Sequence, residues 1–185
     1  MQYGPGFFRF SQPDLAAQVG DANASLFISE LEGQWNHTGS ARLGFDLAGH
    51  LSVEGVLTAT GWNLMSVERG GGGFLGGVAA WHPLQLLYND DRAVDISLFG
   101  GGGYGIVGKS RGADGRFLTA GAALDYYFTP GIFLGGFFRY IKPQFDKFYI
   151  DYDHRSVPGN TVDLPNTSGG MFWTAGATLG FRVSL

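Results

Sequence analysis

Residues that can support hydrolysis gather in one stretch near the C-terminus. His154 and Ser156 are separated by one residue, and Asp151, Asp153 and Asp163 lie close to them in the sequence. A serine nucleophile needs a base beside its hydroxyl and an acid that orients the base. The composition of the stretch is therefore compatible with a serine hydrolase. Because the stretch reads as a loop, we expect it to be structural and the chain to have no catalytic activity.

A second set of candidate residues is charged and recurs at alternating positions along the chain. Its members are Glu30, Glu32, Arg42, Asp46, Glu54, Asp95, Asp125, Arg139 and Arg182. Unpaired charges are costly to bury, so such residues are expected to form ion pairs and hydrogen-bonded networks. We expect Arg139 and Arg182 to share carboxylate partners from among Glu30, Glu32, Glu54 and Asp125. The network either lines a gated ion path or fills the interior as a polar plug, and we favour the plug.

Several other chemistries find no support in the sequence. The chain has no Cys, which excludes disulfides and thiolate metal sites. His37, His50 and His82 are scattered, so they do not indicate a metal site. The glycine runs at 70–73 and 100–103 are not followed by the Lys-Ser/Thr of a phosphate loop. We therefore expect no cofactor. The net charge of −4 also makes nucleic acid an unlikely partner.

The composition favours strands over helices. The chain has 32 Gly, 16 Phe, 8 Tyr and 4 Trp among 185 residues, and no apolar run reaches the length of a membrane helix. Its start, MQYGPGFFRF, lacks the basic and apolar regions of a signal peptide. We interpret the sequence as a mature exported chain whose leader has been removed.

A hairpin from Phe117 to Ile141 is the clearest structural unit. Apolar residues alternate with small or polar residues on both arms, which is the period of a strand. Thr129, Pro130 and Gly131 supply the turn. Each arm is about ten residues long, the length of a tilted strand that crosses a bilayer.

Similar segments recur from residue 24 onward and predict eight strands in all. We place them at about 25–35, 41–47, 51–62, 74–82, 93–106, 117–128, 132–141 and 171–185. Residues 1–23 are expected to be a lead-in outside the wall, and residues 24–185 to form the barrel. The connections alternate between short turns and longer loops, as in outer-membrane barrels. The expected turns are at 48–50, 83–92 and 129–131, and the expected loops are at 36–39, 63–73, 107–116 and 142–170. We therefore predict an all-β fold, an eight-stranded antiparallel up-and-down transmembrane β-barrel.

The polar positions favour a membrane barrel over a soluble one. Side chains that face water would be crowded with charges, whereas each predicted strand holds at most two charges among Gly, Ser, Thr and Phe. Aromatic residues also concentrate near the strand ends, as in interfacial girdles. These residues are Trp35, Trp62 and Trp173 toward the longer loops and Trp81, Tyr126 and Phe128 toward the short turns.

The segments ARLGFDLAGHLSVEG, LDYYFTPGIFLGGFFRY and ATLGFRVSL resemble those of the OmpA/OmpX-like family of small outer-membrane β-barrels. The resemblance covers about residues 24–185. Family members usually end in an aromatic residue, and this chain ends in Leu185. The resemblance implies export to the bacterial outer membrane and no single activity, because members serve as anchors, adhesins, enzymes and complex subunits.

We expect a membrane anchor or a subunit of a cell-envelope complex, surrounded by outer-membrane lipid. The alternatives are a lipid A-modifying hydrolase and a soluble lipocalin-like ligand-binding barrel. The pair His154 and Ser156 resembles the His-x-Ser pair of lipid A deacylases, without the Asn and Glu of that motif. Small residues at lipid-facing positions predict a face for an envelope protein or a second copy of the chain. They are Gly77, Ala79, Gly100, Gly102, Ala120 and Ala122.

Overall fold

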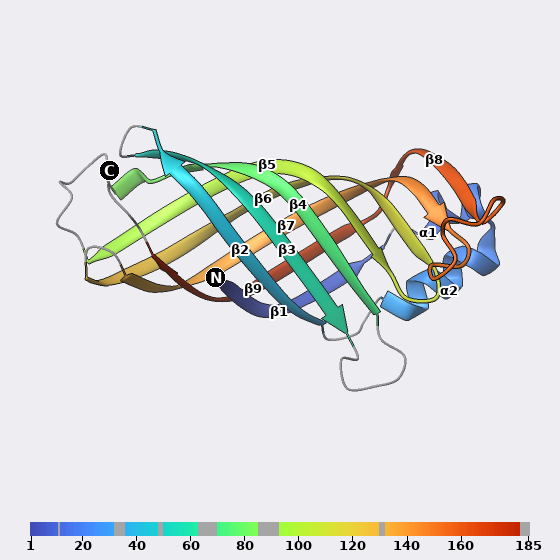
Figure 1. Ribbon diagram of the computed structural model, residues 1–185, viewed down its shortest axis with the longest axis horizontal. Helices are drawn as coiled ribbons and strands as arrows, with labels where there is room; N and C mark the ends of the chain where they lie inside the picture. Colours follow the sequence, from blue (N-terminus) through green and yellow to red (C-terminus); the bar gives the residue numbers. More distant parts are fainter. Residues whose placement is uncertain are drawn as a thin grey trace.

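The computed structural model describes residues 1–10, 12–31, 36–47, 50–62, 70–84, 93–129 and 132–181. The chain starts with strand β1 and two helices and continues as a series of strands (Figure 1). In chain order the elements are β1 (Gln2–Arg9), α1 (Gln12–Val19), α2 (Asp21–Leu31), β2 (Asn36–Asp46), β3 (Leu51–Trp62), β4 (Gly70–Trp81), β5 (Val94–Gly108), β6 (Gly112–Thr129), β7 (Ile132–Tyr149), β8 (Thr161–Ser168) and β9 (Met171–Phe181).

The hydrogen bonds of the sheet run in a ring through eight strands. The order is β1, β2, β3, β4, β5, β6, β7 and β9, and β9 pairs again with β1. Every pairing is antiparallel, so the predicted strand number and direction are confirmed. Strand β8 lies outside this ring and pairs with the far end of β7, between Gln144 and Tyr149.

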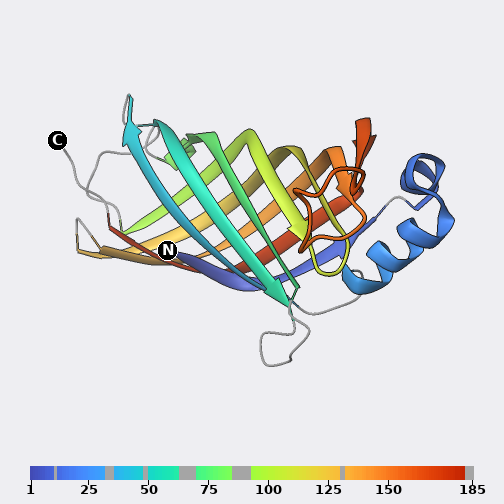
Figure 2. The same ribbon diagram turned by 45° about the vertical axis from the view of Figure 1, so that its right-hand side comes forward.

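The ring has two ends with different connections. We call the end that contains Asp46, Leu51, Trp81 and Val94 the turn rim. The opposite end carries α1, α2 and β8, and we call it the loop rim (Figures 1 and 2). Both helices lie beyond this end of the strands, on the side where β8 extends the sheet.

Side chains alternate between the inside and the outside of the ring, as expected. On β6, Phe117, Thr119 and Asp125 are buried, whereas Leu118 and Leu124 are exposed. This alternation is the period of two that the sequence predicted for the hairpin.

The predicted first strand at 25–35 is wrong, because Asp21–Leu31 is helix α2 and residues 32–35 lie outside the described part of the chain. Ala24, Phe27, Ile28 and Leu31 are buried, and their spacing is that of one helix face. Gly20 separates the helices with a φ of 83° and donates its N–H to Ala16, as a glycine helix cap does.

The missing eighth strand is β1, which the sequence placed in a lead-in outside the wall. Gln2–Arg9 instead pairs with β2 on one side and β9 on the other and closes the ring. Its alternation is hidden because Gly4 and Gly6 occupy inward positions. A Cβ on Gly4 would lie 1.9 Å from the carbonyl oxygen of Ala175, so only glycine fits between β1 and β9 there.

Other predicted boundaries move toward longer strands. The predicted strand 51–62 matches β3, whereas the expected loop at 36–39 belongs to β2 and pairs with β1. The glycine run at 70–73, expected in a loop, begins β4. The loops expected at 107–116 and 142–170 are shorter in the structure, because β5, β6 and β7 extend into these ranges.

Candidate functional site

The interior of the ring holds a polar region centred on Arg139 of β7. Arg139 is only 2% exposed. Its guanidinium donates to Gln2 Oε1 at 2.7 Å, to Thr58 Oγ1 at 3.0 Å and to Ser40 Oγ at 3.1 Å. These partners are neutral oxygens on three other strands. Among the described contacts, none joins Arg139 to Glu30, Glu54 or Asp125, which were three of its expected carboxylate partners.

Arg42 of β2 and Glu54 of β3 form the ion pair of this region. Arg42 Nε donates to Glu54 Oε2, and the two positions are close in the pairing of β2 with β3, where Glu54 faces Gly44. The guanidinium carbons of Arg42 and Arg139 lie 5.0 and 5.4 Å from the ring centre of Phe99. One aromatic ring thus contacts both cations, which is a favourable arrangement.

Three residues near the turn rim extend the network. Ser52 Oγ lies 3.1 Å from His82 Nε2, and His82 Nδ1 lies 2.7 Å from Asp95 Oδ2. Ser52 Oγ also contacts Glu54 Oε1 at 3.3 Å. A continuous chain of contacts therefore runs from Arg42 through Glu54, Ser52 and His82 to Asp95.

The remaining charges predicted for the interior occupy different environments. Asp125 is buried on β6, directly opposite Asp95 on β5. Asp46 is exposed at the turn rim. Glu30 is on α2, outside the polar region, where it accepts hydrogen bonds from the backbone N–H groups of Ser110 and Arg111. Glu32 and Arg182 lie outside the described residues.

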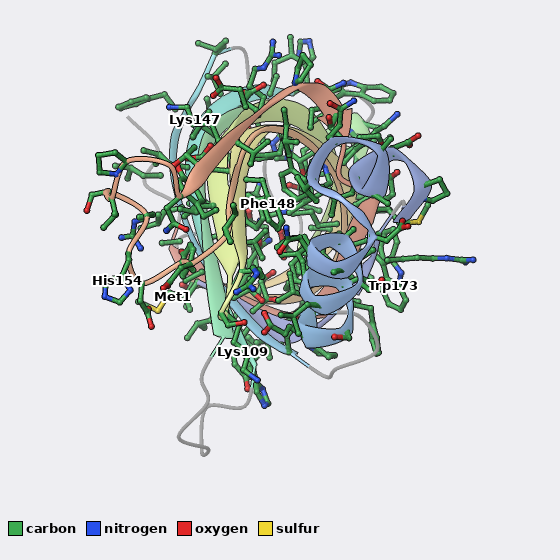
Figure 3. All side chains as sticks on the ribbon, turned by 90° about the vertical axis from the view of Figure 1, so that its right-hand side faces the viewer. Met1, Lys109, Lys147, Phe148, His154 and Trp173 are labelled. Atoms are coloured by element: carbon green, nitrogen blue, oxygen red, sulfur yellow. The ribbon has the colours of Figure 1, made fainter. Side chains whose placement is uncertain are left out.

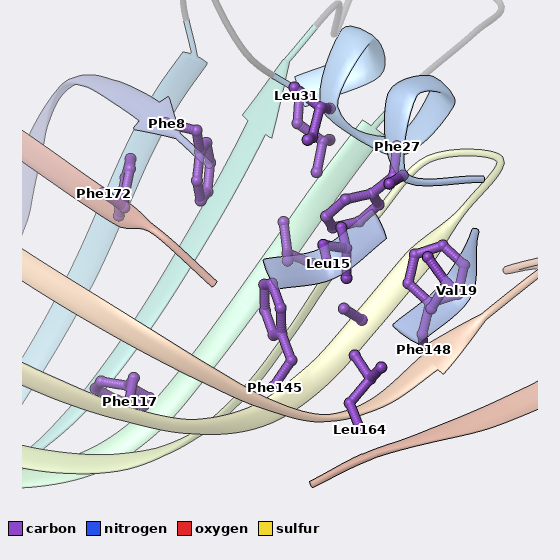
Figure 4. Close-up of a cluster of buried hydrophobic side chains, with 14 of the residues drawn as sticks. Phe8, Leu15, Val19, Phe27, Leu31, Phe117, Phe145, Phe148, Leu164 and Phe172 are labelled. Carbon is purple, nitrogen blue, oxygen red and sulfur yellow. The ribbon is translucent and has the colours of Figure 1, made fainter. Parts of the chain in front are cut away.

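The interior toward the loop rim is apolar and is closed by the helices. Leu15 and Phe27 pack with Phe145, Phe148 and other side chains from the strands (Figure 4). Phe27 makes edge-to-face contacts with Phe10, Phe145 and Phe148, at centroid distances of 5.2, 6.0 and 5.5 Å. The helices therefore act as a packed plug, and the Glu30 bonds hold α2 to the β5–β6 turn.

Little space remains between the polar and apolar regions. A cavity beside Val56, Thr58, Phe117, Arg139 and Ile141 has a free volume of about 10 Å³. That is room for about one water molecule. The described side chains in this part of the interior thus leave no space there for a larger ligand.

The outer surface of the ring is apolar. Leu43 is 81% exposed, Phe45 68% and Leu75 66%. On β6 the outward residues from Leu118 to Phe128 include no charged side chain, and the same holds on β7 from Ile132 to Tyr140. Charged outward side chains such as Arg116 and Lys142 lie nearer the loop rim. Trp81, Tyr126 and Phe128 are exposed at the turn rim, where an aromatic girdle was expected.

The small residues of the expected partner face are neighbours on the outer surface. Ala79 pairs with Gly100, and Gly100 pairs with Ala120. Gly77 pairs with Gly102 in the next row. Ala122 follows on β6, opposite Leu98. The six positions therefore form one contiguous patch across β4, β5 and β6.

The connection between β7 and β8 carries His154, which lies outside the ring (Figure 3). His154 Nδ1 lies 2.9 Å from Asp151 Oδ2. This hydrogen bond lowers the pKa of the Asp151 carboxyl. Burial raises the pKa of the nearby Tyr152 hydroxyl. Asp151 thus orients the imidazole, but among the described contacts none joins His154 to the exposed hydroxyl of Ser156.

No family model, curated protein or solved structure matches this chain. Among the described residues, no group of three or more His, Asp and Glu side chains could hold a metal ion. Neither described helix has the length and hydropathy needed to cross a membrane.

Sequence reasoning missed Ser52 and His82 as members of the interior network. Ser52 shares its alternating positions with Glu54, so its inward direction was predictable. His82 was considered only as one of three scattered histidines, and its partners are 30 and 13 residues away in the chain. The positions of the three residues along the strands could have revealed the network. Ser52 is near the start of β3, His82 directly follows β4 and Asp95 is near the start of β5. All three therefore lie at one rim.

Proposed function

We propose that the ring is an integral β-barrel of the bacterial outer membrane and that the chain serves as an anchor or as a subunit of an envelope complex. The observation that carries the proposal is an apolar band on the outer surface, without charges from Leu118 to Phe128 on β6 and from Ile132 to Tyr140 on β7, around an interior that holds Arg42, Glu54, Asp95, Asp125 and Arg139. Water would favour the reverse arrangement. Lipid on the outside and a polar, packed interior are the arrangement of transmembrane barrels.

The dimensions of the apolar surface support the same proposal. The strand from Leu118 to Phe128 is about 33 Å long at about 3.3 Å per residue. With a tilt of about 40°, it rises about 25 Å, the height of the apolar band of membrane barrels. The resemblance of the hairpins to OmpA/OmpX-like barrels agrees with this interpretation.

The soluble ligand-binding alternative has less support. A lipocalin-like barrel needs an interior space for its ligand, whereas the cavity that described residues form beside Arg139 has room for about one water molecule. Its outer surface would also need to be wetted, and residues such as Leu43 and Phe45 are largely exposed.

A hydrolase acting on lipid A remains the alternative from a different class. It rests on the bond between Asp151 and His154 in the connection after β7. Its weakness is Ser156, whose hydroxyl has no described contact with the imidazole. Loss of lipid A hydrolysis in Ser156→Ala would support this alternative, and the absence of any such hydrolysis by the unaltered chain would remove it.

The membrane proposal is tested by refolding the chain. We expect it to fold only with detergent or phospholipid vesicles and to migrate on gels as a compact species that heating converts to a slower one. A monomer that folds in plain buffer would contradict the proposal.

The small-residue patch is our proposed partner face, for a second copy or another envelope protein. Small residues let another surface approach closely within a membrane. Cysteines placed at Ala120 and Ala122 should cross-link in native membranes more than a cysteine placed at Leu179 on β9. Equal cross-linking at Leu179 would remove the basis for this face.

A further inference from the structure

The Ser52, His82 and Asp95 contacts reproduce the connectivity of a serine-hydrolase triad. His82 Nε2 lies 3.1 Å from Ser52 Oγ, the position of the nucleophile in such a triad. His82 Nδ1 lies 2.7 Å from Asp95 Oδ2, the position of the acid. A triad is recognised by this geometry and these roles, whatever the fold and the chain order. The side chains of His82 and Asp95 are 12% and 6% exposed, and Ser52 is 4% exposed.

The sheet fixes the three side chains independently of one another. Ser52 pairs with Ala80 on β4, two residues before His82. The His82 N–H donates to the carbonyl oxygen of His50 at 2.8 Å. Asp95 is held by the pairing of β5 with β6. Three successive strands thus place the nucleophile, base and acid together, and no flexible segment is needed to assemble them.

We propose that Ser52, His82 and Asp95 form a serine-hydrolase triad that cleaves small carboxylic esters reaching it from the turn rim. This activity goes beyond the anchoring role and departs from our expectation of a chain without catalysis. It does not depend on the membrane proposal, because the triad faces the interior of the ring whatever medium surrounds the outer surface.

The chemistry follows from the contacts. Ser52 Oγ attacks the ester carbonyl carbon while its proton passes to His82 Nε2. The C–O bond to the leaving alcohol then breaks, and His82 returns the proton to that alcohol. Water, deprotonated by His82, attacks the acyl-Ser52, and the released carboxylic acid leaves Ser52 with its proton restored. Asp95 is a positioning residue that accepts the Nδ1 hydrogen and stabilises the imidazolium.

Two carboxylates contact members of the proposed triad. Asp95 contacts the imidazole of His82 directly, and Glu54 contacts the hydroxyl of Ser52. Glu54 Oε1 also competes for the Ser52 proton, at 3.3 Å against 3.1 Å for His82 Nε2. The neutral form of His82 is the one that accepts this proton, so activity should rise with pH.

The position of the triad limits the substrate. The packed interior blocks approach from the centre of the ring, and the helices close the loop rim. Ser52 lies beside the exposed residues Asp46 and Leu47 at the turn rim. A short acyl group is therefore expected, and an intact lipid chain is not.

A fluorophosphonate reagent tests the proposal on the full chain refolded in detergent micelles. We expect one phosphonyl adduct, mapped by mass spectrometry to Ser52 in the unaltered protein. Labelling, measured from about pH 6 to about pH 9, should become faster as pH rises, because only a neutral imidazole can accept the Ser52 proton. Hydrolysis of p-nitrophenyl acetate should follow the same pH profile.

Matched variants separate catalysis from structure. Ser52→Ala should abolish labelling, and His82→Gln should slow it by about 100-fold or more. Asp95→Asn should lower the rate and alter the pH profile. Ser97→Ala is the control, because Ser97 is also buried on β5 and has no described contact with His82. Heat-modifiable mobility verifies that each variant is folded.

Two outcomes would overturn the triad. The first is a folded, unaltered chain that shows no adduct at Ser52 at any pH in that range. The second is an equal labelling rate in folded His82→Gln, which would make the Ser52–His82 contact a purely structural bond. Either result leaves the membrane proposal intact, since that proposal is decided by detergent dependence.

Discussion

An arginine placed at the centre of the apolar surface gives the sharpest test of whether lipid or water surrounds the ring. Leu124 points outward from β6 and is 54% exposed. From Leu118 to Leu124 the strand rises about 15 Å at 3.3 Å per residue and a tilt of about 40°. Leu124 is therefore within about 3 Å of the middle of the 25 Å band, and Leu118 and Phe128 mark its edges.

The expected cost of Leu124→Arg depends on what surrounds it. In a bilayer, an arginine at the midplane of a barrel costs about 2–4 kcal/mol, and near the interfaces about 0–1 kcal/mol. On a water-exposed surface the same change would be within about 0.5 kcal/mol of neutral. Leu124→Arg should thus lower the free energy of unfolding far more than Leu118→Arg or Phe128→Arg.

The assay is reversible guanidinium unfolding in phospholipid vesicles, followed by tryptophan fluorescence. A cost of about 3 kcal/mol corresponds to an equilibrium shift of about 150-fold. Leu124→Gln is a control for the loss of the leucine side chain without a charge. Equal costs for arginine at the three depths would refute the reasoning, because depth dependence is what a bilayer imposes.

Three further predictions concern the interior and the loop rim. Glu54→Gln leaves Arg42 unpaired and should cost about 3 kcal/mol in unfolding experiments; restored stability in a Glu54→Gln, Arg42→Met double variant would confirm the coupling. Phe27→Ala should cost about 3–5 kcal/mol in local stability and expose α2 to limited proteolysis while the ring persists; unchanged cleavage would argue against a packed plug. The Asp151 carboxyl has a folded-state pKa below its unfolded value. Its contribution to stability is therefore fully present above the unfolded pKa and is lost as pH falls through the folded-state pKa. The His154 connection should therefore loosen at acidic pH by hydrogen exchange, and Asp151→Asn should remove that dependence.

Local alternation was sufficient to predict most of the ring. Strand β3 matches its expected bounds, and β6 ends at Thr129 and β7 begins at Ile132, on either side of the expected turn. Strand ends were harder, since continuation of β7 beyond Ile141 depends on pairing with β6 and β8. Those partners supply hydrogen bonds that no local pattern records.

The N-terminal error has a specific physical cause. The segment around Phe27 satisfies two periods at once, because Phe27 and Leu31 alternate as in a strand and, with Ala24 and Ile28, also form one helix face. Periodicity alone therefore does not decide between a strand and a helix for this segment. Packing decides, since the helix buries all four side chains against the apolar interior at the loop rim.

The candidate site was less accessible to prediction than the fold because its members are joined only by the ring. Alternation predicts that Ser52, Glu54 and Asp95 point inward. It does not predict that they lie at the same height along the axis of the ring, because that height depends on the register of β3 with β4 and of β4 with β5. The same register places the carboxylate of Asp95 opposite that of Asp125, a like-charge pairing that is unfavourable by itself. The contact with His82 Nδ1 satisfies one carboxylate oxygen of Asp95, so the contact that orients the proposed base also stabilises this buried acid, and His82→Gln should reduce stability as well as labelling.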